Sequence, residues 1–190
     1  MPSPLGHSLA GLAIGLAAEP AAVAQASGTR LSSFAIVGAA VAAMPDLDLL
    51  LPHMHRGVSH SVGATAVLMI IAAAVTGWVT GRIQWRWVLL VGAAHGSHIL
   101  MDWMGTDHYA PAGLQALWPF SRAYYISGWD IFPATERRLY LPQSWIINLR
   151  AFLAEVGIMV PIAIVAFLAK RTRRSRGLTS VQDSLQRPSA

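Results

Sequence analysis

The sequence predicts an all-α integral membrane bundle of about four to five helices with an interfacial loop region. Its 190 residues are 54% hydrophobic, with a mean hydropathy of +0.47. Charged residues make up 12% of the chain, compared with roughly 25% in a typical soluble domain. Such a chain lacks the polar surface that a soluble domain needs, so we expect the lipid bilayer to be its solvent and main partner.

Five apolar segments are candidates for the helices, because a spanning helix needs about 20 apolar residues. The segments are 5–26, 31–44 (or as far as 51), 58–80, 85–104 and 146–169. The third is the clearest, because its stretch "VGATAVLMIIAAAVTGWVTG" carries no charge. The first two are expected to be short or to lie partly in the membrane interface.

The remaining residues form a long connection and a tail. Segment 105–145 mixes aromatics with Pro and Gly, as in "LWPFSRAYY" and "GWDIFP", which indicates an ordered loop at the headgroup level. Residues 170–190 begin with the basic run "KRTRRSRG". Nucleic acid could explain that run, but a run directly after an apolar helix favours a positive-inside signal. We therefore expect one membrane-embedded domain, 1–169, a disordered tail, 170–190, and no nucleic-acid partner.

The arginines predict the orientation of the bundle. With five spans, Arg30, Arg82, Arg86 and the basic tail fall on one side of the membrane. Basic loops favour the cytoplasmic side. We therefore expect an inner-membrane protein with a cytoplasmic C-terminus, and we expect the 45–60 connection and the 105–145 loop on the opposite side.

Metal-ligand side chains gather at that opposite end of the predicted bundle. The chain has no cysteine, so any metal must be bound by His, Asp or Glu. The candidates open or close four of the helices or follow directly after one: His7, Asp46, Asp48, His60, His98, Asp102 and His108. Their shared end predicts one site built from several segments.

The spacing within the fourth segment supports this site. His98 and Asp102 are four residues apart and share one face of a helix, and an ionisable residue there usually has a partner. His95 shares that face. It could support the metal ligands, or equally well form a hydrogen bond with a neighbouring backbone carbonyl. Imidazole and carboxylate without sulfur suit zinc, with manganese or iron as alternatives.

The sequence allows two interpretations of several side chains. One of Asp46 and Asp48 is expected to be a ligand, while the other caps a helix or lies in the loop. His53 is expected to lie among lipid headgroups, and the role of His55 is open.

The ligand set indicates hydrolysis through metal-activated water. One or two ions could activate water and neutralise a phosphoester, with Asp102 bridging or orienting and Asp46 or Asp48 as the base. Arg56 could bind a phosphate oxygen through its fork of donors, or could anchor in the headgroups. The rival interpretation is a non-catalytic metal-binding membrane protein, such as a transporter, sensor or scaffold.

The motifs "PSPLGHSLAG", "PDLD", "HRGVSHS", "HGSHILMDW" and "LWPFS" together resemble the YdjM-like membrane-bound metal-dependent hydrolases, a family also labelled LexA-regulated. That family is grouped with zinc-dependent phospholipases C and single-strand nucleases. The resemblance implies a hydrolase of a phospholipid-like or other amphiphilic substrate. It also implies an ordered ligand set of His7, Asp46 or Asp48, His60, His98, Asp102 and His108. No histidine follows His108, so the resemblance implies one or two ions rather than three.

Overall fold

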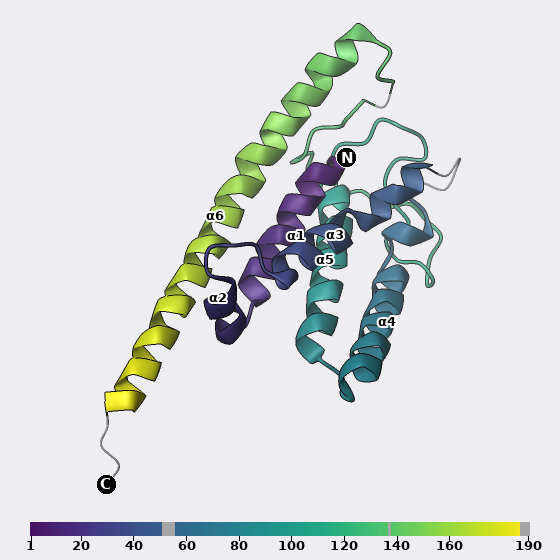
Figure 1. Cartoon of the computed structure of the whole chain (residues 1–190). Coiled ribbons are helices and arrows are strands. Elements are labelled where there is room, and N and C mark those ends of the chain that lie inside the picture. The colour runs from purple at the N-terminus through teal and green to yellow at the C-terminus, as the bar shows by residue number, and fades with distance from the viewer. Residues whose placement is uncertain (51–55, 137, 187–190) are drawn as a thin grey trace.

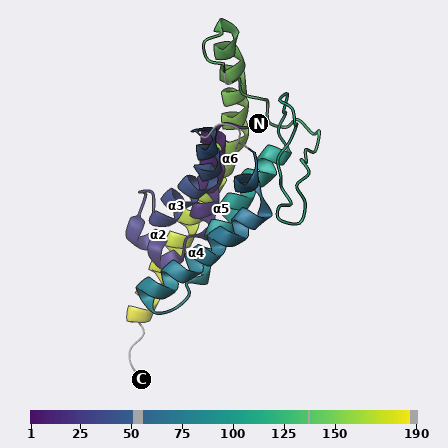
Figure 2. The same ribbon diagram turned by 90° about the vertical axis from the view of Figure 1, so that its right-hand side faces the viewer.

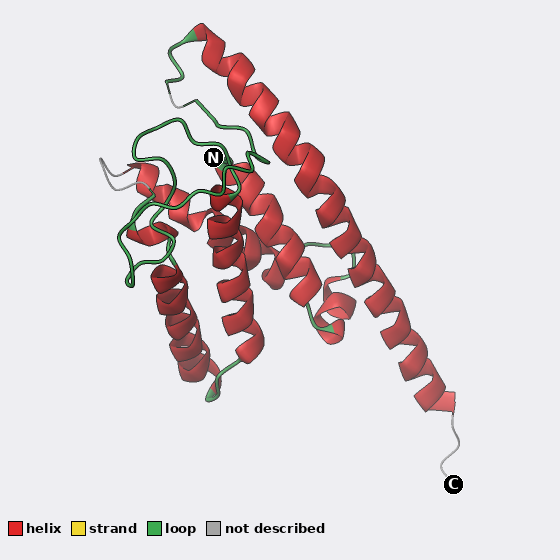
Figure 3. Ribbon diagram, turned by 180° about the vertical axis from the view of Figure 1, so that it is seen from behind, coloured by secondary structure: helices red, strands yellow, loops and turns green. Residues whose placement is uncertain are grey.

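The computed structural model of the chain describes residues 1–50, 56–136 and 138–186, with side chains as far as 175. Within these residues the fold is all-helical and contains no β-strand (Figure 3), which confirms the predicted fold class. The α-helices are α1 (Pro4–Ala18), α2 (Ala21–Ser27), α3 (Ser33–Ala43), α4 (Val62–Thr80), α5 (Trp85–Trp103) and α6 (Pro142–Gln186). Two 3₁₀ helices, η1 (Met44–Leu50) and η2 (Val58–His60), connect α3 to α4.

The first apolar segment is two helices rather than one. Pro20 disfavours helical geometry at the residue before it, and Glu19 is extended, with φ −62° and ψ 126°. As a result, α1 and α2 are bent by 112° at this break. The prediction of a single helix over 5–26 is therefore wrong at its centre.

Helices α1 and α3 pack through glycines. A Cβ atom on Gly11 would lie 2.1 Å from the carbonyl oxygen of Gly38, and one on Gly15 would lie 2.3 Å from that of Phe34. Both distances are far too short for a real side chain, so only glycine permits this approach. Small residues at helix contacts are typical of membrane proteins. The close contact fixes where α3 ends, and therefore where η1 begins.

Helices α4 and α5 form an antiparallel hairpin (Figure 1). The Ser61 side chain caps the start of α4 by accepting from the backbone N–H of Ala64. Gly81, with φ 74°, ends α4 in the left-handed conformation that glycine adopts without steric cost. No residue of α4 is buried, whereas one face of α5 is buried against α1 and α3. Helix α4 therefore presents its apolar surface to lipid.

Helix α6 extends beyond the segment predicted for it. The expected helix was 146–169, followed by a disordered tail, but the helix continues as far as Gln186. Lys170 is buried, lies 3.3 Å from the Glu19 carboxylate and donates to the carbonyl oxygen of Arg30. The Arg173 guanidinium donates to the carbonyl oxygen of Leu16 at the end of α1. The helix continues past Ala169 because the first basic side chains of the predicted tail find acceptors on α1 and the α2–α3 connection, and because Lys and Arg favour helix.

Among the described residues, three helical stretches are long and apolar enough to cross a membrane: Ser33–Leu50, Val62–Thr80 and Pro142–Ser175. The bent pair of α1 and α2 would make a fourth. The sequence predicted a bundle of about four to five helices. Helix α5 is not among these stretches, because His95, His98 and Asp102 lower its hydropathy.

The loop between α5 and α6 is ordered, as predicted. Backbone N–H groups of Val62 and Gly63 donate to the carbonyl oxygens of Ala116 and Trp118, both at 2.9 Å. These bonds hold the loop on the first turn of α4. Figures 1 and 2 show the loop at the end of the molecule where the N-terminus lies, with the C-terminal end of α6 at the opposite end.

Glycine packing of α1 on α3 predicts a stability effect. Gly11→Ala should lower the free energy of unfolding by about 1–3 kcal/mol, the usual cost of overpacking, because its Cβ meets backbone. Gly157→Ala is the matched control, because its Cβ meets nothing within 4 Å. Thermal unfolding in detergent should show a lower Tm for Gly11→Ala only. Equal Tm values for both variants would contradict the packing account.

The arrangement also predicts sidedness. Ser175 lies at one end of the bundle and Ser121 lies in the loop at the other end. The chain has no cysteine, so single substitutions Ser175→Cys and Ser121→Cys give clean labelling sites. An impermeant thiol reagent should label Ser121→Cys from outside the cytoplasmic membrane and Ser175→Cys only after the membrane is opened. Labelling of both from one side would overturn the topology.

Candidate metal centre

The Asp102 carboxylate lies among three histidine rings. Its Oδ1 is 3.3 Å from Nε2 of His7, and its Oδ2 is 3.5 Å from Nε2 of His60 and 3.3 Å from Nε2 of His98. Helix α1 supplies His7, η2 supplies His60, and α5 supplies both His98 and Asp102. Residues that are far apart in sequence therefore meet at one end of the bundle.

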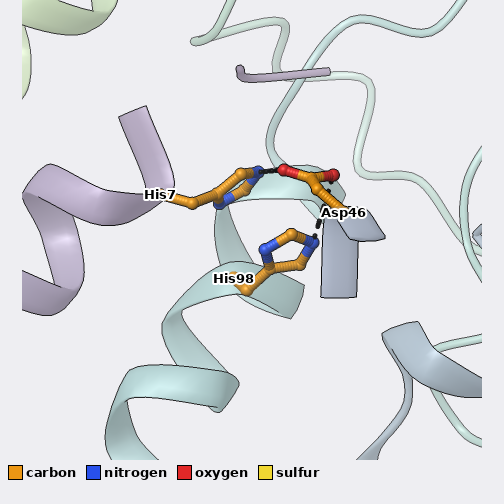
Figure 4. A group of neighbouring side chains, drawn as sticks. All are labelled: His7, Asp46 and His98. Carbon is orange, nitrogen blue, oxygen red and sulfur yellow. Dashed lines mark ion pairs between the residues drawn. The ribbon is translucent and has the colours of Figure 1, made fainter. Parts of the chain in front are cut away.

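Asp46, from η1, faces the same three rings. Its carboxylate oxygens lie 4.0 Å from Nε2 of His7, 3.9 Å from that of His60 and 4.0 Å from that of His98. Figure 4 shows the His7 and His98 rings, from α1 and α5, directed toward Asp46. These two rings stack, with centroids 3.7 Å apart. Three imidazoles and two carboxylates thus share one small volume, which we call the metal centre: His7, Asp46, His60, His98 and Asp102.

The metal centre is buried, and several of its polar atoms lack hydrogen bonds. The three histidines are 0% exposed and Asp102 is 1% exposed. Nε2 of His7 and of His98 and Oδ2 of Asp46 have no hydrogen-bond partner among the described residues. Buried polar atoms are rarely left so, because their desolvation is costly. A bound cation would satisfy these atoms.

Two overlapping groups have the geometry to hold a metal ion. In His7–Asp46–His98, and again in His60–His98–Asp102, the ligand atoms all lie within 4.8 Å of one another. His98 belongs to both groups. Its Nδ1 lies 2.7 Å from the carbonyl oxygen of Ala42, which can only accept, so Nδ1 carries the proton and Nε2 keeps the lone pair. One lone pair serves one ion, so His98 cannot complete both groups at once.

Asp48 lies behind His60 rather than inside either group. Its Oδ2 is 3.2 Å from Nδ1 of His60 and accepts a hydrogen bond of 2.5 Å from the Ser59 hydroxyl. Burial lowers the pKa of His60, but the neighbouring carboxylates of Asp46 and Asp48 outweigh it and raise the pKa to about 9. The carboxylates around His60 therefore favour a positive charge at this point, supplied either by a proton or by a cation that replaces it. Of the two carboxylates between which the sequence left the choice open, Asp46 faces the three rings and Asp48 contacts only one of them.

Two other candidates lie elsewhere among the described residues, and two more fall outside those residues. Both ring nitrogens of His95 have partners, Thr65 Oγ1 at 2.7 Å and the carbonyl oxygen of Ser59 at 3.1 Å. This matches the backbone-bonding alternative for His95. His108 is exposed and belongs to neither metal group, because the chain turns away after α5 ends. His53 and His55 lie outside the described residues.

Arg56 contacts the loop after α5. Its guanidinium forms an ion pair with Asp107 and donates to the carbonyl oxygen of Tyr109 at 3.5 Å. Asp107 in turn accepts from the backbone N–H groups of Tyr109 and Gly113. Arg56, expected to bind phosphate, thus holds this loop against the 56–60 connection.

Glu155 is a contributor to which the sequence analysis assigned no role. This buried carboxylate in α6 accepts from the backbone N–H of Ser3 at 2.7 Å and from the Ser3 hydroxyl. Ser3 is the N-cap of α1, and His7 lies in the first turn of that helix. Glu155 therefore fixes the turn that carries His7. The available signal was an acidic residue within an apolar segment, which usually has a defined partner.

Comparison with known proteins identifies a family. A family model described as YdjM inner membrane protein matches residues 1–176, which confirms the resemblance seen in the motifs. No curated protein and no solved structure matches the chain. The matched range contains all five residues of the metal centre.

The role of Glu155 predicts an effect on metal affinity. Glu155→Gln should weaken metal binding by about tenfold, the lower end of the range for residues that support metal ligands, because an amide replaces one acceptor at the start of α1. Glu19→Gln is the matched control, because Glu19 joins the other end of α1 to α6 through Lys170. Competitive chelator titration should show a loss for Glu155→Gln only. Equal losses would mean that both residues simply tether α6.

Proposed function

The chain belongs to the YdjM inner membrane protein family, and on that premise we propose that it is a membrane-bound metal-dependent hydrolase of a phosphoester in a lipid or other amphiphile. One observation carries the proposal. Three imidazole nitrogens and two carboxylates converge in a buried site, where some of their polar atoms have no hydrogen-bond partner. Burying polar atoms without hydrogen bonds costs free energy of desolvation, and a bound cation would offset that cost.

The residues present fit a single small divalent ion. Zinc binds nitrogen and oxygen donors at about 2.0–2.2 Å, so two ligands of one ion lie at most about 4.4 Å apart. The contacts of Asp46 and Asp102 with the ring nitrogens range from 3.3 to 4.0 Å. Donors without sulfur suit zinc, manganese or iron. A second ion would need ligands beyond His98, which can serve only one.

When bound, such an ion would supply activated water at neutral pH and offset the charge of a phosphoester. Residues of the chain would orient the metal ligands and accept a proton. Asp102 would orient the ring nitrogens of His7, His60 and His98. Asp46, which has the longest contacts in the site and an oxygen without a hydrogen bond, would accept the proton of the attacking water.

Asp48 would keep the His60 ring in place. Its hydrogen bonds to Ser59 and His60 make it a poorer base than Asp46, although the sequence alone allowed either. Carboxylate–histidine pairs of this kind fix the tautomer and raise the basicity of a metal-binding ring.

An apolar cavity beside the metal centre favours an amphiphilic substrate. This cavity of about 560 Å³ lies between α4, α5 and the loop. Its walls include Val62, Ile99 and Trp103, which are neighbours in sequence of His60, His98 and Asp102. Because α4 faces lipid, an acyl chain could enter this cavity from the bilayer while its polar end stays near the metal centre.

A non-catalytic metal-binding protein is the second candidate, and burial of the centre favours it. Structural metal sites are closed, whereas catalytic sites keep one coordination position open. Cobalt-substituted protein distinguishes the two, because azide can change the visible spectrum only by taking an open position. A spectrum unchanged by azide would favour a transporter, sensor or scaffold.

Asp102→Asn tests the proposal directly. The substitution keeps the shape of the side chain but removes a negative charge from a buried site, where charge interactions are strong. We expect purified Asp102→Asn protein to contain much less metal and to lose turnover in a screen of phosphodiester and phospholipid substrates. The helical fold, measured by circular dichroism, should be retained.

Asp130→Asn is the matched control for that experiment. Asp130 is an exposed aspartate in the loop between α5 and α6, with φ 51°, a conformation that Asn also tolerates. It should keep wild-type metal and activity. Full metal and activity in Asp102→Asn would show that the hydrolytic centre is misassigned.

A further inference from the structure

A second cavity lies at the same end of the molecule, between the 105–136 loop and the first turns of α6. Its volume is about 550 Å³, and no residue of the metal centre lines it. Its polar wall is formed by Thr106, His108, Thr135, Glu136, Arg138 and Arg150. Two of these, His108 and Arg150, have no role in the metal centre.

The acidic residue of this wall is already neutralised. The Glu136 carboxylate accepts from the Arg138 guanidinium at 2.8 and 3.0 Å and from the Tyr109 hydroxyl at 2.8 Å. Hydrogen bonds from Arg138 hold the pKa of Glu136 well below its usual range. Glu136 and Arg138 therefore cancel in charge, and neither repels an anion.

Arg150 gives the cavity a net positive charge. Its side chain is exposed on α6, and no described residue forms an ion pair or hydrogen bond with its guanidinium or with the His108 ring. A guanidinium offers five N–H donors in a planar fork that matches phosphate oxygens. The hydroxyl of Thr106 adds a donor to the same wall, whereas that of Thr135 donates to the carbonyl oxygen of Met1.

The wall is fixed before any ligand arrives. The Asn148 side chain of α6 donates to the carbonyl oxygen of Glu136 at 2.9 Å and accepts from its backbone N–H at 2.7 Å. The backbone N–H of Thr106 donates to the carbonyl oxygen of Phe132 at 2.8 Å, and Phe132 is buried. The Asn148 bonds join the loop to α6, and the Thr106 bond joins its beginning to its later part, so binding needs little reorganisation.

Exposed aromatic side chains place the cavity at the depth of lipid headgroups. Trp129, Tyr140 and Trp145 are 63%, 80% and 67% exposed and lie in or next to the segments that form the cavity. Trp and Tyr concentrate where a membrane meets water, and lipid phosphates occupy that layer. We propose that this cavity binds the phosphate group of a membrane lipid, with Arg150 as its principal donor.

A matched pair of ligands tests this proposal on the full chain in detergent. Dioctanoyl phosphatidic acid and dioctanoylglycerol have the same acyl chains and differ by the phosphate. We expect wild-type protein to bind the phosphate-bearing lipid at least tenfold more tightly, as measured by thermophoresis. Arg150→Gln should abolish that difference, whereas Arg150→Lys should retain part of it.

Arg122→Gln is the control variant, because Arg122 is exposed in the same loop and does not line the cavity. It should bind both lipids as wild type does. Equal behaviour of Arg150→Gln and Arg122→Gln would overturn the proposal. So would phosphate selectivity that disappears after metal chelation but survives Arg150→Gln, since the lipid would then be bound at the metal centre.

The same variants show whether the bound phosphate belongs to the substrate or to a resident lipid. If the bound lipid is the substrate, Arg150→Gln should raise KM for a hydrolysed phospholipid with little change in kcat. If it is a resident lipid, binding should be lost without a change in KM. The binding assay requires no turnover, so absence of hydrolysis would refute the proposed function and leave the phosphate site standing.

Discussion

The burial of one carboxylate among three imidazoles is the constraint on which the rest of the structure depends. Asp102 is 1% exposed, and His7, His60 and His98 are fully buried around it. Placing charged and polar groups in an apolar bundle is expensive unless they are paired or bind a cation. The fold meets this cost by bringing α1, η1, η2 and α5 to one point, so the site and the packing of the bundle form together.

Helix α6 supplies no ligand, yet it controls the position of α1, which does. Glu155 holds the first turn of α1, and Lys170 and Arg173 hold the region where that helix ends. The helix is therefore fixed to α6 at both ends. The glycines of α1 allow it to pack closely against α3. Helix α3 leads directly into η1, which carries Asp46. The position of His7 in the metal centre follows from the Glu155 contact beside it and from the glycine packing of α1 on α3.

The sequence predicted the parts of the site that depend on local spacing and on helix order. His98 and Asp102 share a helical face wherever an α-helix forms, and an alternating topology brings His7 and His60 to the same end. It could not distinguish Asp46 from Asp48, because that choice depends on the 3₁₀ geometry of η1. It misplaced His108 because the direction of a loop after a helix is set by distant contacts. The ordered start of the predicted tail depends on acceptors in α1 and in the α2–α3 connection, which no local pattern reveals.

The central claim is that the buried convergence holds a metal ion, and the most direct test is metal analysis with X-ray absorption spectroscopy on detergent-purified protein. The account predicts about one ion per chain, with only nitrogen and oxygen donors at about 2.0–2.2 Å if the ion is zinc. It also predicts several imidazole ligands in the outer-shell scattering. Protein that contains no bound metal, and takes up none when divalent ions are added, would contradict the account.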